Sequence, residues 1–236
     1  MVVPDDLPPV PSANPSAVPA AVPSTAPAVA DAIELPTRHG TAVAHLRLAA
    51  PGVGVLVLGH GAGGGVDAPD LAAVTTAAAS AGWSVVLVEQ PYRAAGRRVP
   101  PRAPVLDEAW CDVVGALRDQ GVGGLGRSAG APLVTGGRSA GARVACRTAR
   151  ATGAGGVVAL AFPTRPPGQE DSPSRVPELE AAGVPVLVVQ GATDPYGTPP
   201  AGPDREVVVV PGDHGLKKDV DAVARAVVDW LAPFAR

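Results

Sequence analysis

Hydrophobic and polar positions follow a repeating block pattern from about residue 33 to the end of the chain. Residues 41–48 alternate as in a half-buried strand, whereas residues 52–58 form a near-continuous apolar run typical of a strand buried on both faces. Further strands are predicted at residues 84–88, 132–135, 156–161, 185–189 and 206–210, and helices at residues 69–81, 105–118, 140–151, 176–182 and 216–231. This alternation predicts an α/β fold of three layers around a mostly parallel sheet. The irregular insertion at residues 162–177 is too short for a large lid.

The first 32 residues differ from the rest because Pro, Ala, Ser and Val dominate them. They contain neither the basic and apolar regions of a signal peptide nor a run long enough to cross a membrane. Frequent proline removes backbone donors and keeps a chain extended. We therefore expect a disordered tail at residues 1–32 and a single domain at residues 33–236.

Composition and charge narrow the classes of partner. With 236 residues, of which 46% are hydrophobic, the chain can bury one substantial core. A net charge of -3 and an isoelectric point near 5.8 give no overall reason to bind nucleic acid or an anionic membrane. The two cysteines, Cys111 and Cys146, both fall in predicted helices, which favours reduced thiols and a cytoplasmic protein.

The most informative motif is GGRSAG at residues 136–141, which places Ser139 in a G-x-S-x-G turn between a predicted strand and a predicted helix. Such a turn raises a serine hydroxyl above the edge of a sheet, so Ser139 is the candidate nucleophile. The same pattern recurs around Ser128 at residues 126–130, but no strand precedes it and Pro132 follows closely. Ser128 is therefore interpreted as a loop residue.

A nucleophilic serine needs an imidazole base and a carboxylate that orients it, and with this type of turn the chain order is serine, acid, histidine. His214 is the only histidine after Ser139, and it follows a predicted strand. Asp194 directly follows the strand at residues 185–189 and is the preferred acid. Asp213 is the competitor, although a residue next to His214 in an extended turn points away from it.

The oxyanion of an acyl-transfer intermediate needs two backbone donors. The residue after the nucleophile, Ala140, supplies one, and the glycine-rich loop at residues 60–65 follows an early strand and supplies the other from Gly61 or Ala62. His60 is interpreted as an anchor of that loop rather than as a base.

Positive charge is concentrated at residues 93–102 in a chain whose net charge is negative. Such a cluster is either a solvated face or a site where Arg93 or Arg97 holds an anionic or strongly polar substrate. Tyr92, in the same segment, and Arg138, beside Ser139, are further tentative candidates for substrate contacts.

These motifs together resemble a known family. The segments GHGAGG (59–64), PYRAAGRR (91–98), GGRSAGAR (136–143), QGATDP (190–195) and GDH (212–214) resemble small α/β hydrolases related to dienelactone hydrolases. Within these, they are most similar to the branch of testis-expressed and chromatin-complex α/β-hydrolase-like proteins. The resemblance covers nearly everything after the tail, and it implies a serine, acid and histidine at Ser139, Asp194 and His214. A serine replaces the cysteine nucleophile of typical dienelactone hydrolases.

The sequence thus predicts a serine hydrolase of carboxylesterase type that cleaves small acyl compounds and needs no metal or organic cofactor. Two other classes of protein are compatible with parts of this pattern. A catalytically silent binding or scaffold domain could keep the same fold. A dinucleotide-binding protein is suggested by Gly59, Gly61 and Gly64 with Glu89 at the end of the next strand, but residues 65–69 separate these glycines from the following helix.

Overall fold

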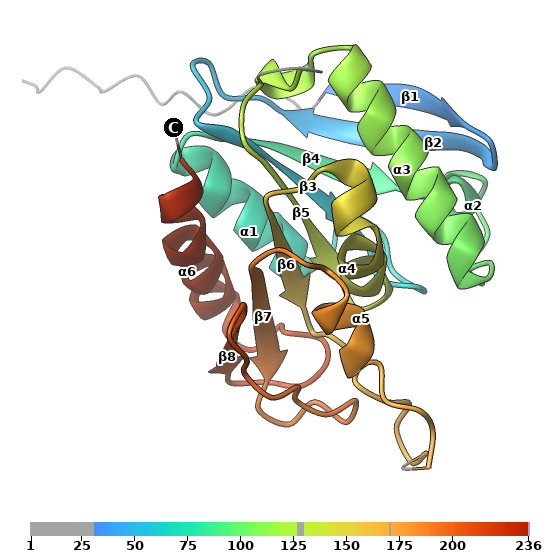
Figure 1. Ribbon diagram of the computed structural model, residues 1–236, viewed down its shortest axis with the longest axis vertical. Coiled ribbons are helices and arrows are strands. Elements are labelled where there is room, and N and C mark those ends of the chain that lie inside the picture. Colours follow the sequence, from blue (N-terminus) through green and yellow to red (C-terminus); the bar gives the residue numbers. More distant parts are fainter. Residues whose placement is uncertain (1–30, 127–129, 170, 236) are drawn as a thin grey trace, which may run out of the picture.

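The computed structural model describes residues 31–126, 130–169 and 171–235, which form one sheet with helices on both faces (Figure 1). The alternative nucleophile Ser128 lies outside the described residues. The strands are β1 (Asp31–Thr37), β2 (Gly40–Arg47), β3 (Gly54–Gly59), β4 (Trp83–Glu89), β5 (Leu133–Arg138), β6 (Gly156–Leu160), β7 (Val186–Gly191) and β8 (Arg205–Val210). The α-helices are α1 (Pro69–Ser80), α2 (Pro91–Ala94), α3 (Ala103–Asp119), α4 (Ala140–Thr152), α5 (Val176–Glu180) and α6 (Val220–Leu231), with short 3₁₀ turns at Val122–Gly124 and Ala232–Phe234.

Within the described residues the sheet contains eight strands in the order β1-β2-β4-β3-β5-β6-β7-β8. Strands β1 and β2 form an antiparallel hairpin and β2 pairs antiparallel with β4, while every pair from β4 to β8 is parallel. The chain moves outward from β3 to β4 and then crosses back to β5 on the other side of β3. Ligands bind at such a reversal, beyond the carboxyl ends of the strands. The loops after β3 and β5 meet there.

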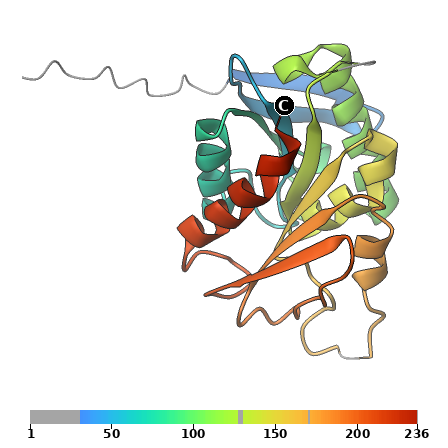
Figure 2. The same ribbon diagram turned by 60° about the vertical axis from the view of Figure 1, so that its left-hand side comes forward.

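The central strands bury both of their faces, as their continuous apolar runs predicted. Leu56 and Leu58 on β3 pack in the core under α1 and α6, whereas the alternate residues Val55 and Val57 pack in the core under α3. A third cluster lies between α4, α5 and strands β6 and β7. Figures 1 and 2 show α1 and α6 on one face and α3, α4 and α5 on the other. The predicted three-layer α/β architecture is therefore confirmed.

Differences from the sequence-based prediction lie mainly at the ends of elements. β1 begins at Asp31, two residues before the predicted domain start at residue 33, and its strand character was not recognised. Only Leu35 of β1 is fully buried, because this edge strand packs one side chain into the core and exposes most of the others. α6 begins at Val220 rather than 216, because the Asp219 carboxylate accepts the Ala222 N–H and caps the helix there.

Further features bear on the predictions above. No inserted domain covers the carboxyl edge of the sheet within the described residues; the segment between β6 and α5 is an irregular loop. Among all the residues that the structure describes, no helix combines the length and apolarity needed to cross a bilayer. Cys111 on α3 and Cys146 on α4 are free thiols, as predicted.

Candidate active site

Ser139 occupies the turn between β5 and α4 in a backbone conformation that side chains rarely adopt, with φ 53° and ψ -105°. Its N–H donates to the Leu160 carbonyl of the neighbouring strand over 2.8 Å, which anchors the turn. The turn requires glycine two residues after Ser139, because a Cβ at Gly141 would lie only 2.6 Å from the Gly59 carbonyl oxygen. The small residues of the motif thus allow α4 to start directly against β3, and the strained turn presents the hydroxyl at the sheet edge.

His214 connects Ser139 to Asp194. Its Nε2 lies 2.9 Å from the Ser139 Oγ, and its Nδ1 lies 2.8 Å from the Asp194 Oδ2. The three side chains come from the loops after β5, β7 and β8, which meet at one edge because parallel strands end together. The structure therefore brings together the three residues that the sequence singled out, in an arrangement compatible with a catalytic triad. The competitor Asp213 instead accepts the Gly215 N–H on its own loop.

The Asp194 carboxylate is fully buried and accepts three hydrogen bonds. Besides the His214 ring, it accepts the Gln190 side-chain amide at Oδ2 over 2.6 Å and the Tyr196 backbone N–H at Oδ1 over 2.9 Å. Hydrogen bonds of this kind compensate the burial of a carboxylate. The Tyr196 ring also packs against the His214 imidazole, with centroids 4.2 Å apart. These contacts fix both the acid and the imidazole ring that it orients.

Two backbone N–H groups are suited to hold an oxyanion beside Ser139. Ala140 is the first residue of α4, so its N–H has no partner within the helix and lies at the positive end of the helix dipole. The loop after β3 lies close by, since a Cβ at Gly61 would be 3.7 Å from the Ser139 Cβ. The Gly61 carbonyl faces the His60 ring at 2.8 Å, and in a trans peptide the following N–H points the opposite way. The Ala62 N–H therefore points away from the His60 ring, and the choice between Gly61 and Ala62 as second donor stays a prediction.

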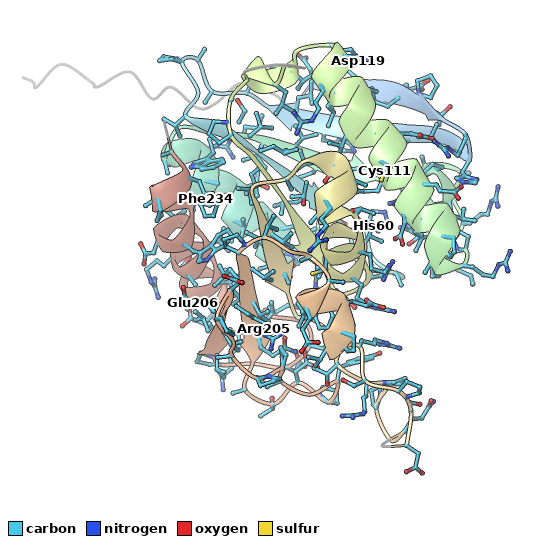
Figure 3. The ribbon with its side chains drawn as sticks, in the orientation of Figure 1. His60, Cys111, Asp119, Arg205, Glu206 and Phe234 are labelled. Carbon is cyan, nitrogen blue, oxygen red and sulfur yellow. The ribbon has the colours of Figure 1, made fainter. Side chains whose placement is uncertain are left out.

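His60 and Tyr92 hold this loop from the inside of the fold. His60 is 3% exposed, and Figure 3 shows its labelled side chain within the fold. Its Nε2 accepts the Gln90 N–H at 3.1 Å, so the proton sits on Nδ1 and is donated to the Gly61 carbonyl. Burial lowers the pKa of His60, which favours this neutral form. Both ring nitrogens are thus engaged with backbone groups, as expected of an anchor.

Tyr92, which the sequence suggested as a substrate contact, is largely buried, and that role stays a prediction. Its hydroxyl donates to the Ala62 carbonyl over 2.8 Å, and the residue is only 6% exposed. Burial raises the pKa of Tyr92 to about 12, so the hydroxyl stays a donor at neutral pH. The structure therefore gives this side chain a contact with the candidate oxyanion loop.

The three arginines of the sequence prediction differ in their surroundings. Arg93 lies near the glycine loop, with its Nη2 4.0 Å from the position of a Cβ at Gly65, and its Nη1 donates to the Arg97 carbonyl. Arg97 is exposed and lines a cavity of about 220 Å³ together with Tyr92. Arg138 is mostly buried and contacts protein atoms: its Nη2 donates to the His214 carbonyl over 2.7 Å and its Nε lies 3.0 Å from the Asp70 Oδ2. Substrate binding by Arg93 and Arg97 stays a prediction.

Sequence reasoning missed several residues around the site. Gln190 and Tyr196 flank Asp194 closely enough in sequence that their contacts could have been expected. Asp70 could not have been found in this way, because nothing in its helix pattern indicates a carboxylate that is fully buried beside Arg138.

The glycine pattern of a dinucleotide site is not matched by the structure. Residues 65–68 separate the glycine loop from α1, whereas a dinucleotide-binding loop leads directly into its helix. Glu89, the candidate ribose ligand, instead contacts the His45 ring at 3.1 Å.

The fold, with no lid in the described residues and a serine in the strained turn between β5 and α4, is that of the α/β hydrolases. The chain belongs to the α/β-hydrolase family, whose domain model matches residues 53–220. Comparison with curated proteins gives no match. The predicted membership of this superfamily is confirmed.

Solved structures with the same fold have low sequence identity to this chain. XC6422 from Xanthomonas campestris, described as an α/β serine hydrolase without a lid, has a TM-score of 0.67 and 18% identity, covering 89% of this chain and 96% of its own. A dienelactone hydrolase from Anabaena variabilis has a TM-score of 0.68 and 16% identity, covering 88% and 98%. The mouse α/β hydrolase domain-containing protein 10 has a TM-score of 0.61 and 13% identity, covering 87% and 100%. At these identities the likeness concerns the fold.

Proposed function

We propose that this protein is a serine hydrolase that cleaves esters or related acyl compounds of modest size through an acyl-enzyme. The observation that supports this most directly is the hydrogen-bonded series from the Ser139 Oγ to the His214 Nε2 and from the His214 Nδ1 to the Asp194 carboxylate, at 2.9 and 2.8 Å. A serine in strained backbone at the carboxyl edge of the sheet adds to it. Carboxylesterase-type specificity agrees with a site that no lid covers within the described residues.

The proposed reaction has two halves. The Ser139 oxygen attacks the acyl carbon while its proton passes to the His214 Nε2, and the N–H of Ala140 and a second N–H from the loop after β3 stabilise the negative oxygen of the tetrahedral intermediate. Collapse of this intermediate breaks the bond to the alcohol, which leaves with the proton held by His214. Water then attacks the acyl-enzyme, gives its proton to the same nitrogen, and releases the carboxylic acid while Ser139 regains a proton. Every group named belongs to this chain, apart from substrate and water.

Two measurements test this proposal. A fluorophosphonate probe should label the wild-type protein but not the Ser139→Ala variant, and hydrolysis of short p-nitrophenyl esters should fall by about 10⁶-fold in the same variant. Ser80→Ala serves as a matched control, because Ser80 is a helical serine in α1 whose hydroxyl donates to the Thr76 carbonyl in its own helix. That variant should label and turn over like wild type.

The opposite results have clear meanings. Equal ester hydrolysis by wild type and Ser139→Ala refutes the assignment of Ser139. Absence of labelling in a protein that is folded by circular dichroism supports the binding or scaffold domain in place of an enzyme.

A further inference from the structure

Arg138 is a charged residue inside the nucleophile motif that the proposed reaction does not use. It ends β5, directly before Ser139, and its side chain is 17% exposed. Its Nη2 donates to the His214 carbonyl over 2.7 Å. Its Nη1 lies 3.1 Å from where a Cβ at Gly61 would stand, so the guanidinium also packs against the candidate oxyanion loop. One side chain thus contacts the loops on which the proposed base and the proposed oxyanion donor lie.

Asp70 holds this guanidinium from the opposite side. It is the second residue of α1, its side chain is fully buried, and its Oδ2 lies 3.0 Å from the Arg138 Nε. Burial raises the pKa of Asp70, and the nearby Arg138 acts in the opposite direction. A buried ion pair contributes little net stability compared with well-packed apolar side chains, because both charges lose their hydration. Stability therefore gives a weak reason for these two charges to be here.

The loop that contains His214 is held from two other strands. On one side, the Thr193 backbone N–H and hydroxyl both donate to the Gly212 carbonyl, at 2.9 and 3.0 Å, and tie the start of the loop to the end of β7. After His214 the backbone bonds are local, with the Gly215 N–H donating to the Asp213 carboxylate and the Leu216 N–H to the Asp213 carbonyl. The Arg138 guanidinium supplies a bond from β5, the strand that also positions Ser139.

We propose that Arg138, held by its ion pair with Asp70, is a positioning residue that fixes the backbone of His214 and the loop at Gly61 relative to Ser139. This inference rests on the proposed hydrolase function and assigns Arg138 a role through His214 rather than through substrate. A displacement of about 1 Å between a nucleophile and its base lowers turnover by about 10²-fold. Because the guanidinium touches no substrate in this role, the loss falls on kcat.

The experiment compares Arg138→Met, Arg138→Lys and Asp70→Asn with a matched control, Arg147→Met. Arg147 on α4 is equally buried, at 18% exposure of its side chain, and is paired with Asp107 and Glu178 outside the site. With a short p-nitrophenyl ester, Arg138→Met should lower kcat by about 10²-fold with KM changed less than about twofold. Arg138→Lys should lose less kcat than Arg138→Met, since an ammonium keeps the positive charge but lacks the planar guanidinium that contacts Asp70 and the His214 carbonyl together. Asp70→Asn should show a smaller loss of kcat, and Arg147→Met none.

Several outcomes overturn the inference. One is an Arg138→Met enzyme with kcat within about twofold of wild type, and another is a loss that appears in KM, as expected of a substrate contact. A third is an equal loss of kcat in Arg147→Met, which would make the effect a general consequence of removing a buried cation. If Arg138→Met does not fold, as judged by urea unfolding, Asp70→Asn decides, and unchanged kcat in that variant refutes the role.

A readout without turnover separates this inference from the proposed function. The proton on the His214 Nδ1, in the hydrogen bond to the Asp194 carboxylate, is expected to give a downfield resonance in proton NMR of the wild-type protein. Arg138→Met should broaden or abolish that resonance, while Arg147→Met should leave it in place. If the wild type hydrolyses no ester but this difference is seen, the hydrolase proposal fails and the positioning by Arg138 stands. An unchanged resonance in Arg138→Met overturns the positioning.

Discussion

Replacement of Asp194 by asparagine is the sharpest test of the site, because the change keeps the shape of the side chain and alters only its hydrogen bonding. In the structure three donors converge on two carboxylate oxygens: Gln190 and His214 at Oδ2, and the Tyr196 N–H at Oδ1. An asparagine offers one oxygen and one NH₂ group. Each of its two orientations therefore turns a donor toward a donor in a fully buried place.

The two orientations have different consequences. If the amide oxygen takes the Oδ2 position, the Tyr196 N–H loses its acceptor, which costs about 1–3 kcal/mol of stability. If the NH₂ group takes that position, the His214 ring must accept at Nδ1 and carry its proton on Nε2. It then cannot take the proton of Ser139. The expected loss of kcat in this tautomer is about 10⁴-fold, or about 5.4 kcal/mol of activation free energy.

The assay is steady-state hydrolysis of a short p-nitrophenyl ester, with urea unfolding of the same preparations. Asp213→Asn is the matched control, because Asp213 is the exposed neighbour of His214 and its carboxylate accepts the Gly215 N–H, a bond that asparagine can also make. We expect kcat of that variant within about twofold of wild type. The reasoning is refuted if Asp194→Asn keeps both kcat within tenfold and the urea midpoint of wild type, or if Asp213→Asn loses as much kcat as Asp194→Asn.

Three further predictions concern the surroundings of the site. Tyr92→Phe removes the donor to the Ala62 carbonyl, so urea unfolding should show a loss of about 1 kcal/mol and ester assays a decrease in kcat of about tenfold; unchanged kcat would show that the loop holds its position without this bond. Gly141→Ala places a Cβ 2.6 Å from the Gly59 carbonyl oxygen and should lower the free energy of unfolding by about 1–3 kcal/mol with loss of activity, whereas an unchanged urea midpoint would contradict the close approach. The pKa of Asp70 is raised in the folded state above its ordinary value of 3.8. The protonated carboxyl therefore favours folding at pH values below 3.8, and this contribution is lost as the pH rises through the pKa of the folded state. In urea titrations at increasing pH, wild type should therefore lose stability relative to Asp70→Asn, and a gain would contradict the direction of the shift.

Most of the fold could be predicted because the central strands leave a strong pattern. The apolar run that became β3 has no polar position on either face, and the only structure that buries both faces of a strand is a sheet covered on both sides. β1 was missed for the complementary reason. It is an edge strand with a single fully buried residue, Leu35, so its sequence has little apolar periodicity to detect.

The candidate triad could be located from chain order and strand ends, since the carboxyl ends of parallel strands meet. What could not be predicted is the set of contacts between loops. Whether Gly61 or Ala62 donates to an oxyanion depends on the orientations of two successive peptides, and the hydrogen bond between His60 and the Gly61 carbonyl, which fixes one of them, is not visible in the sequence. Likewise, a sequence shows that Arg138 precedes Ser139, but its partners Asp70 and His214 are 68 and 76 positions away.

Apart from serine and threonine, the buried polar residues that the structure describes lie near the site of the proposed chemistry, and the absence of a covering lid in the described residues gives a physical reason. His60, Asp70, Gln90, Gln190 and Asp194 are each at most 9% exposed, and each contacts a loop at the carboxyl edge or a residue that does. An enzyme that closes a lid can assemble its donors and exclude water as substrate binds. Where no lid closes, as in the part of this chain that the structure describes, the donors must already be in position before substrate arrives, because moving them during the reaction would raise its barrier. Fixed hydrogen bonds from these buried side chains meet this requirement. Substitutions among them should therefore lower kcat more than they alter KM.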